Sequence, residues 1–208
     1  MYEYNTGKIR LSKNKTFVLA SNNQHKISEI KHLTEHLGLE ILSMREAGIV
    51  DDIVEDGSTF EENSFIKARH IYERYGFQSI ADDSGLEVEA LNGAPGVYSA
   101  RYAGEEKSDG MNNALLIKNM ADKENRNARF VSVITVIHQD EDGRVCRSVF
   151  RGEVSGIIID TPRGTHGFGY DPLFEMNGKT MAELEESEKN KISHRARAMK
   201  RFLEALRD

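Results

Sequence analysis

The sequence predicts an α/β fold, and three observations support this prediction. Short apolar runs alternate with amphipathic helical patterns through the first half of the chain. A β-rich run at 128–138 is followed by the two-residue turn signal Asp142-Gly143 and a second β-rich run at 145–150. The composition, with 38% hydrophobic and 30% charged residues, is that of a globular protein.

The bulk properties exclude several classes of protein. A chain of 208 residues is usually one domain and buries roughly 70% of its unfolded surface. We interpret residues 1–15 as a polar N-terminal extension and 16–208 as a single two-lobed domain. The net charge of −6 argues against a nucleic-acid partner. The lone Cys146, the absence of a signal-peptide pattern and the absence of a long apolar run predict a cytoplasmic protein without membrane partners.

The elements of the first half are well marked. Residues 17–20 read as a buried strand, and a helix follows with Ile27, Ile30, Leu33 and Leu37 on one face and Gly38 as its stop. A short strand is expected at 39–43 and an irregular acidic segment at 44–57. A second helix then begins near Ser58 and Thr59, whose spacing to Glu61 and Glu62 predicts a capping box, and it ends at Gly76.

The second half is more irregular at its start. A strand at 78–81 is expected to deliver Asp82 and Asp83 at its end, and 86–104 reads as a long Gly-rich loop. Further elements are expected at 108–120 (helix), 128–138, 145–150 and 154–159 (strands), around 180–187 (helix) and from 193 onward (helix).

The motif ADDSG, residues 81–85, is the first candidate for chemistry. Adjacent carboxylates at a strand end suit Mg²⁺, which keeps several waters and bridges to substrate phosphates. A carboxylate beside the metal can take a proton from an attacking water. The alternative is that Asp82 and Asp83 are ordinary turn residues. Glu55, in the loop before the second helix, is a further carboxylate within reach of a shared metal.

The motif SNNQHK, residues 21–26, lies between a strand and a helix. A helix N-terminus attracts anions, Asn22 and Asn23 offer amide donors, and Lys26 adds positive charge. These features predict a triphosphate-binding loop beginning at Ser21, although an Asn N-cap and a solvated lysine would give the same pattern.

Two segments near the C-terminus complete the candidates. The segment GFGYDP, residues 167–172, presents aromatic residues that can stack on a nucleobase. The alternative is a structural loop in which Asp171 is only a turn residue. The segment EKNKISHRAR is a basic cluster in an acidic chain, and its donors can bond base carbonyls or phosphate oxygens. The alternative is a solvated helix start. The candidate residues here are Phe168, Gly169, Tyr170, Asp171, Lys189, His194 and Arg195.

Together these motifs resemble the inosine/xanthosine triphosphate pyrophosphatase family, in the family's order and from Phe17 to the C-terminus. The resemblance implies an elongated α/β fold with a long mixed sheet flanked by helices, two lobes with a central active-site cleft, and a homodimer. It implies that Asp83 is the catalytic base and a Mg²⁺ ligand, with Glu55 as a second metal-binding carboxylate. The implied substrate-binding residues are Ser21, Asn22, Asn23, Lys26, Ser84, Phe168, Gly169, Tyr170, Asp171, Lys189, His194 and Arg195.

The implied reaction converts a non-standard purine nucleoside triphosphate (ITP, dITP or XTP) and water into the monophosphate and pyrophosphate. Donors such as His194 and Arg195 would bond a 6-oxo group and reject the 6-amino group of adenine. Two alternatives stay open: a Mg²⁺-dependent pyrophosphatase of another modified nucleotide, and a non-catalytic nucleotide-binding protein.

Overall fold

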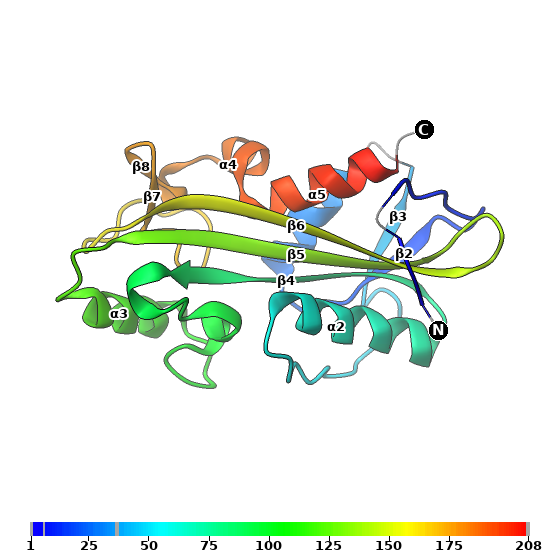
Figure 1. Cartoon of the computed structure of the whole chain (residues 1–208), viewed down its shortest axis with the longest axis horizontal. Coiled ribbons are helices and arrows are strands. Elements are labelled where there is room, and N and C mark those ends of the chain that lie inside the picture. The colour runs from blue at the N-terminus through cyan, green and yellow to red at the C-terminus, as the bar shows by residue number, and fades with distance from the viewer. Residues whose placement is uncertain (1, 6, 36–37, 207–208) are drawn as a thin grey trace. The chain divides into compact units, whose positions relative to one another are not determined.

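The computed structural model describes residues 2–5, 7–35 and 38–206. Its strands form a mixed sheet in the order β3-β2-β4-β5-β6-β7-β8 (Figure 1), and β1 pairs with β6. The strands are β1 (Glu3–Tyr4), β2 (Thr16–Leu19), β3 (Glu40–Ser43), β4 (Gln78–Val88), β5 (Asn127–Gln139), β6 (Val145–Ile158), β7 (Phe174–Met176) and β8 (Lys179–Thr180). β2 pairs in parallel with β3 and β4, whereas β6 pairs antiparallel with β7. The predicted α/β class with a mixed sheet is confirmed.

Five α-helices accompany these strands in the described part of the chain: α1 (Gln24–Thr34), α2 (Phe60–Tyr75), α3 (Asp109–Met120), α4 (Glu186–Ile192) and α5 (His194–Ala205). The 3-10 helices are η2 (Glu89–Leu91), η3 (Gly96–Arg101) and η4 (Met181–Glu183). None of the helices in the described ranges is long and apolar enough to cross a membrane.

The chain divides into two compact units. Unit 1 comprises residues 1–83, 133–151 and 198–208, and unit 2 comprises 84–132 and 152–197. The strand β4 passes from one unit to the other between Asp83 and Ser84. Each unit therefore has its own core.

Unit 1 is built from elements whose ends the sequence marks clearly. Asn23 caps α1 by accepting a hydrogen bond from the Lys26 backbone N–H, and Thr59 caps α2 in the same way through Glu62. Gly76 ends α2 in the left-handed conformation, with φ of 72°. One hydrophobic cluster joins β2 to the C-terminal part of α5, and another joins β2 to α2. The expected position of Leu37 in the first helix lies outside the described residues.

The N-terminal extension is part of unit 1. The two-residue strand β1 pairs in parallel with Cys146 and Arg147 of β6. Ile9 is buried in the same hydrophobic cluster as β2, and its N–H donates to the Ala205 carbonyl at 2.7 Å. A polar segment with few apolar residues thus contributes one of them to the core.

Unit 2 has a single hydrophobic cluster. Leu86 and Val88 of β4, Leu116 and Met120 of α3, and Phe130 of β5 belong to it. Other members are Ala128, Val154, Ile158, Tyr170, Leu173, Phe174, Met181 and Leu184. This core supports the β4 segment that begins at Ser84.

Two expected element boundaries are wrong. First, Asp82 and Asp83 do not end a strand, because β4 continues to Val88. Carboxylates disfavour strand interiors, but the burial of Leu86 and Val88 on the unit 2 core extends the strand past them. The long loop expected at 86–104 therefore begins only at Glu89.

Second, the helix expected around 180–187 is broken into β8, the 3-10 helix η4 and then α4. The cause is tertiary: the Ala182 N–H donates to Asp171, and the Ala182 carbonyl accepts from Thr165 and His166. These bonds replace the intrahelical ones. By contrast, the strands expected at 145–150 and 154–159 form one continuous strand, β6.

Candidate active site

The centre of the site in unit 1 is Lys67, a buried lysine on α2. Its ammonium nitrogen lies 2.6 Å from Glu55 Oε2, 3.2 Å from Asp83 Oδ1 and 2.9 Å from the Asp82 carbonyl oxygen. Lys67 occupies the inward face of α2 together with Ser64, Ala68 and Ile71. It joins the loop carboxylate Glu55 to the strand carboxylate Asp83.

Lys67 was not among the residues that the sequence analysis assigned to the site. The signal for it was its spacing, because position 67 lies three residues after Ser64 and four before Ile71 on the apolar stripe of α2. A lysine on such a stripe must be paired when it is buried.

Asn63, another buried polar residue of α2, holds the Glu55 loop in place. Its side-chain oxygen accepts a hydrogen bond of 2.8 Å from the Gly57 N–H. A Cβ atom at position 57 would lie 2.7 Å from that oxygen, so only glycine permits the approach. This contact explains why a poor helix former occupies the first turn of α2.

Lys26 lies in the first turn of α1 and pairs with Asp82, the other carboxylate of β4. Its ammonium nitrogen is 2.8 Å from Asp82 Oδ2, and the Asp82 side chain is fully buried. The loop before it is ordered by its own side chains, since the Asn23 N–H donates to the Ser21 hydroxyl at 3.1 Å. The side-chain oxygen of Asn23 accepts the hydrogen bond of the helix cap, and the Asn22 side chain is exposed.

Burial and charge act in opposite directions on this group. Burial raises the pKa of Asp83 above its ordinary value, and the nearby Lys67 and Lys26 only partly oppose this effect. Burial also raises the pKa of Glu55, but the attraction of Lys67 outweighs it and leaves that pKa below its ordinary value. For Lys67 burial lowers the pKa, and the pull of Asp83 and Glu55 more than reverses this. The group thus favours an ionised Glu55 and a charged lysine beside a carboxylate that resists ionisation.

The residues of this group fit a divalent cation. Asp83 Oδ2 is buried and has no hydrogen-bond partner in the described part of the chain, and such an orphaned oxygen is costly unless it gains a ligand. Within the ranges that the structure describes, no three His, Cys, Asp or Glu side chains are grouped to hold a metal by themselves. Mg²⁺ nevertheless binds through one or two carboxylates together with substrate phosphates, and Glu55 and Asp83 match that requirement.

In unit 2, Ser84 and the start of α5 form a second cluster. Arg195 is buried, and its guanidinium donates to the Ser84 hydroxyl at 3.0 Å. His194 stacks on Phe130, with ring centroids 4.9 Å apart and an interplanar angle of 18°. The last helix therefore does not begin in solvent, and the alternative of a solvated basic cluster is wrong for these two residues.

The Gly-rich loop brings Phe168 close to two basic residues, Lys189 and Arg195. The Phe168 ring centroid lies 4.9 Å from the Lys189 ammonium and 5.8 Å from the Arg195 guanidinium carbon. Asp171 is buried, pairs with Lys189 at 2.6 Å and accepts the Phe168 N–H at 3.0 Å. Asp171 thus fixes both the ring and the cation.

Tyr170, in contrast, is a core residue. It is buried in the unit 2 cluster, and its hydroxyl donates to the Ser99 carbonyl at 2.8 Å. Burial raises its pKa beyond the usual range of a tyrosine. The Tyr170 ring therefore packs in the unit 2 core.

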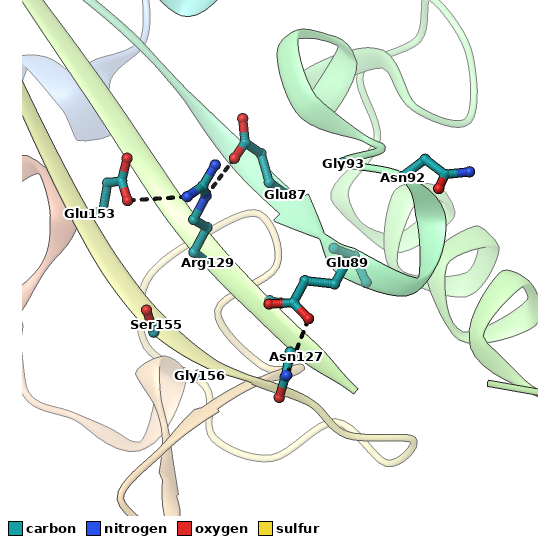
Figure 2. A pocket seen from close by; sticks show the side chains of 11 residues that line it. Glu87, Glu89, Asn92, Gly93, Asn127, Arg129, Glu153, Ser155 and Gly156 are labelled. Carbon is teal, nitrogen blue, oxygen red and sulfur yellow. Dashed lines mark hydrogen bonds and ion pairs between the residues drawn. The ribbon is translucent and has the colours of Figure 1, made fainter. Parts of the chain in front are cut away.

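A cavity of about 630 Å³ in unit 2 contains none of the predicted site residues (Figure 2). Arg129 crosses it and pairs with Glu87 at 2.6 Å and with Glu153 at 3.4 Å. Asn127 donates to Glu89 at 3.2 Å. These side chains satisfy one another, so the cavity presents a network of paired charges and gives no indication of a particular ligand.

The two clusters have complementary chemistry. The unit 1 cluster offers carboxylates and lysines for a metal and phosphates, and the unit 2 cluster offers an aromatic ring, an arginine and a lysine. Asp83 ends the first and Ser84 begins the second, and the two residues are consecutive on β4. The fold and these clusters define an α/β protein of the nucleotide-binding class.

The particular family follows from comparison with known proteins. A model of the Ham1 family matches residues 17–205, and the chain belongs to this family. It is 48% identical over 204 residues to a dITP/XTP pyrophosphatase of Clostridium perfringens, covering 93% of this chain and 98% of the relative. It is 43% identical over 196 residues to the Bacillus subtilis dITP/XTP pyrophosphatase, covering 92% and 97%.

Solved structures agree with this assignment. The chain is similar to the Ham1 protein of Staphylococcus aureus, with a TM-score of 0.80, 44% identity and coverage of 91% of this chain and 98% of that one. It is also similar to a HAM1 protein of Coxiella burnetii, with a TM-score of 0.81, 41% identity and coverage of 90% and 95%. The family that the motifs resemble is thereby confirmed.

Proposed function

We propose that this protein hydrolyses non-standard purine nucleoside triphosphates, such as dITP, ITP and XTP, to the monophosphate and pyrophosphate. The observation that carries the proposal is the group formed by Glu55, Asp83 and Lys67, with its orphaned carboxylate oxygen. The names of the relatives, dITP/XTP pyrophosphatases, support the substrate class. Removal of such nucleotides would cleanse the pool of precursors.

Glu55 and Asp83 are the residues that would hold Mg²⁺. The ion would neutralise charge on the phosphates and on the pyrophosphate leaving group. Lys67 keeps both carboxylates in place, since its ammonium contacts each of them. Asp83 Oδ2, which has no partner among the described residues, is the atom that would accept the proton of the attacking water.

Lys26 has a second contribution in this proposal. In the absence of substrate it neutralises the buried Asp82 carboxylate. Because it lies in the first turn of α1, it is also near the exposed N–H groups of that helix, which favour anions. Ser21, Asn22 and Asn23 complete this phosphate-binding loop.

The residues of unit 2 would bind the nucleoside. Phe168 would stack on the base, and Lys189 and Asp171 hold its ring in position. His194 and Arg195 would donate to the 6-oxo group of hypoxanthine or xanthine. Adenine presents an amino group there, and a buried donor left unpaired costs about 1–3 kcal/mol. Ser84 would contact the substrate, with Gly169 and Tyr170 shaping the pocket.

The proposal includes a Mg²⁺ cofactor, a homodimeric assembly and a cytoplasmic location. The carboxylate pair supports the first of these. The composition and the lone, buried Cys146 are compatible with a reducing compartment.

A substrate panel tests the proposal. ITP, XTP, dITP, GTP, ATP and dUTP are each incubated with the protein and Mg²⁺, and pyrophosphate and orthophosphate are measured separately. We expect pyrophosphate from the 6-oxo non-standard purines and at least tenfold lower kcat/KM for ATP, the factor that about 1.4 kcal/mol produces. Orthophosphate as first product, or a preference for dUTP, would contradict it.

A further inference from the structure

The backbone of Gly169 is held on both sides by one helix. Its N–H donates to Asp109 Oδ2 at 2.7 Å, and its carbonyl oxygen accepts from the Asn113 amide at 2.9 Å. Asp109 and Asn113 are four residues apart on α3, so they lie on the same face of the helix. α3 therefore grips both polar groups of a single residue in the Gly-rich loop.

This grip determines where Phe168 lies. The Phe168 carbonyl and the Gly169 N–H belong to one planar peptide unit, so the bond to Asp109 orients that plane. On its other side, the Phe168 N–H is bound by Asp171. Gly169 has φ of 64°, a left-handed conformation that turns the chain between Phe168 and the buried Tyr170.

α3 is itself fixed in unit 2. The Asn112 side chain accepts from the Ala103 N–H at 2.8 Å and donates to the Ala100 carbonyl at 3.1 Å. Leu116 and Met120 anchor the helix in the core. The first turn of α3 is therefore a rigid support for the loop.

The side-chain amide of Asn113 is only partly satisfied by hydrogen bonds among the described residues. Its amide oxygen is buried and has no partner within the described part of the chain, and such an atom costs about 1–3 kcal/mol. The amide nitrogen of the same side chain donates its hydrogen bond to the Gly169 carbonyl oxygen.

We propose that Asp109 and Asn113 are positioning residues for the nucleobase, acting through Gly169 on Phe168. The inference rests on the proposed function and deepens it, since it assigns α3 a role in base binding. Stacking on Phe168 is equal in the ground state and the transition state, so loss of the grip raises KM and leaves kcat unchanged.

The test compares substitutions on α3 with ITP as substrate. Asp109→Ala and Asn113→Ala each raise KM by about five- to tenfold, the effect of one lost hydrogen bond, with kcat within about twofold of the wild type. Asp109→Asn retains an acceptor for Gly169 and restores KM. Because both side chains act on the backbone of one residue, the double variant is less impaired than the product of the single effects.

The matched control is Asn119→Ala. Asn119 is a half-buried asparagine on the same helix, but its amide donates to the Tyr102 hydroxyl at 2.7 Å. Its loss leaves KM unchanged. A second variant, Asn113→Leu, removes the unsatisfied oxygen and keeps the unfolding midpoint while raising KM, which a purely structural role for Asn113 would not produce.

The same series is measured as the Kd of ITP in an Asp83→Asn background, where turnover does not interfere. If the wild type released no pyrophosphate but Kd rose with Asp109→Ala and Asn113→Ala, the proposed reaction would fail and the positioning role would stand. Lower kcat at unchanged KM, an unchanged Kd, or an equal effect of Asn119→Ala would overturn the positioning role.

Discussion

The ammonium nitrogen of Lys67 lies 3.2 Å from Asp83 Oδ1, and both side chains are buried. The same nitrogen is 2.6 Å from Glu55. One lysine on a helix thus connects a loop carboxylate with a strand carboxylate. Removing the lysine leaves two carboxylates without their shared cation in a poorly solvated place, whereas removing one carboxylate leaves Lys67 paired with the other.

Replacement of Lys67 by methionine should therefore destabilise the protein. The change leaves Asp83 and Glu55 facing each other without the cation, and breaking a buried pair in this way costs about 3–5 kcal/mol. Urea denaturation measures the loss as a lower midpoint at unchanged slope. The control is Lys118→Met, at an exposed position of α3. Similar losses in both variants would contradict the structural role of Lys67.

Substitution Asp83→Asn should abolish turnover without unfolding the protein. An amide cannot take the proton from water, and loss of a general base costs about 10²–10⁴ in rate. Because burial disfavours the ionised carboxylate, the neutral amide is expected to leave the unfolding midpoint at or above that of the wild type. Pyrophosphate release from ITP and urea denaturation check the two expectations. Asp122→Asn, at an exposed position, is the control, and normal turnover by Asp83→Asn would disprove the base assignment.

Stability should fall in mild acid because of His138 on β5. Burial lowers its pKa to about 4, which the attraction of Asp140 only partly offsets, and neither ring nitrogen has a hydrogen-bond partner in the described ranges. In the unfolded state the His138 imidazole has a pKa near 6.5, so in mild acid it binds a proton that the buried imidazole of the folded state does not bind. The contribution is complete above pH 6.5 and is lost as the pH falls toward 4, by as much as about 3 kcal/mol.

Urea denaturation between pH 4 and 8 measures this loss for the wild type and for His138→Phe. The variant lacks the titrating group, so its free energy of unfolding should vary less over that interval. Identical pH dependence of the two proteins would show that other groups cause the acid sensitivity.

The N-terminal extension should contribute to stability through Ile9. Ile9 is buried in a cluster with Phe17 and Phe202, and truncation of a buried isoleucine to alanine costs about 2–5 kcal/mol. The measurement is the free energy of unfolding of Ile9→Ala. Ile157→Ala, at a position that is 39% exposed, should cost clearly less. Equal effects would mean that residue 9 is not part of the core in solution.

Much of the fold was readable from local patterns. The capping residues Asn23 and Thr59 and the stop at Gly76 predicted α1 and α2, because these signals act within one helical turn. The turn at Asp142-Gly143 predicted the connection of β5 and β6. The motifs were also sufficient to indicate the family, since their order along the chain is itself information.

The boundaries that failed depended on distant residues. No local signal shows that β4 continues past Asp82 and Asp83, because the reason is the core formed with α3 and β5. The same holds for η4, whose backbone bonds Asp171 and the Gly-rich loop. Tertiary contacts override local propensity in both places.

The sequence by itself predicted which side chains carry the chemistry: the carboxylates Glu55 and Asp83, Lys26 and the aromatic ring of Phe168. Only the tertiary structure decided how they are held. Lys67, Asn63, Asp109 and Asn113 act on residues that are 6 to 60 positions away along the chain. The packing of each helix within its own unit brings these partners together. The spacing of residues along the chain does not reveal which distant residues meet in this way.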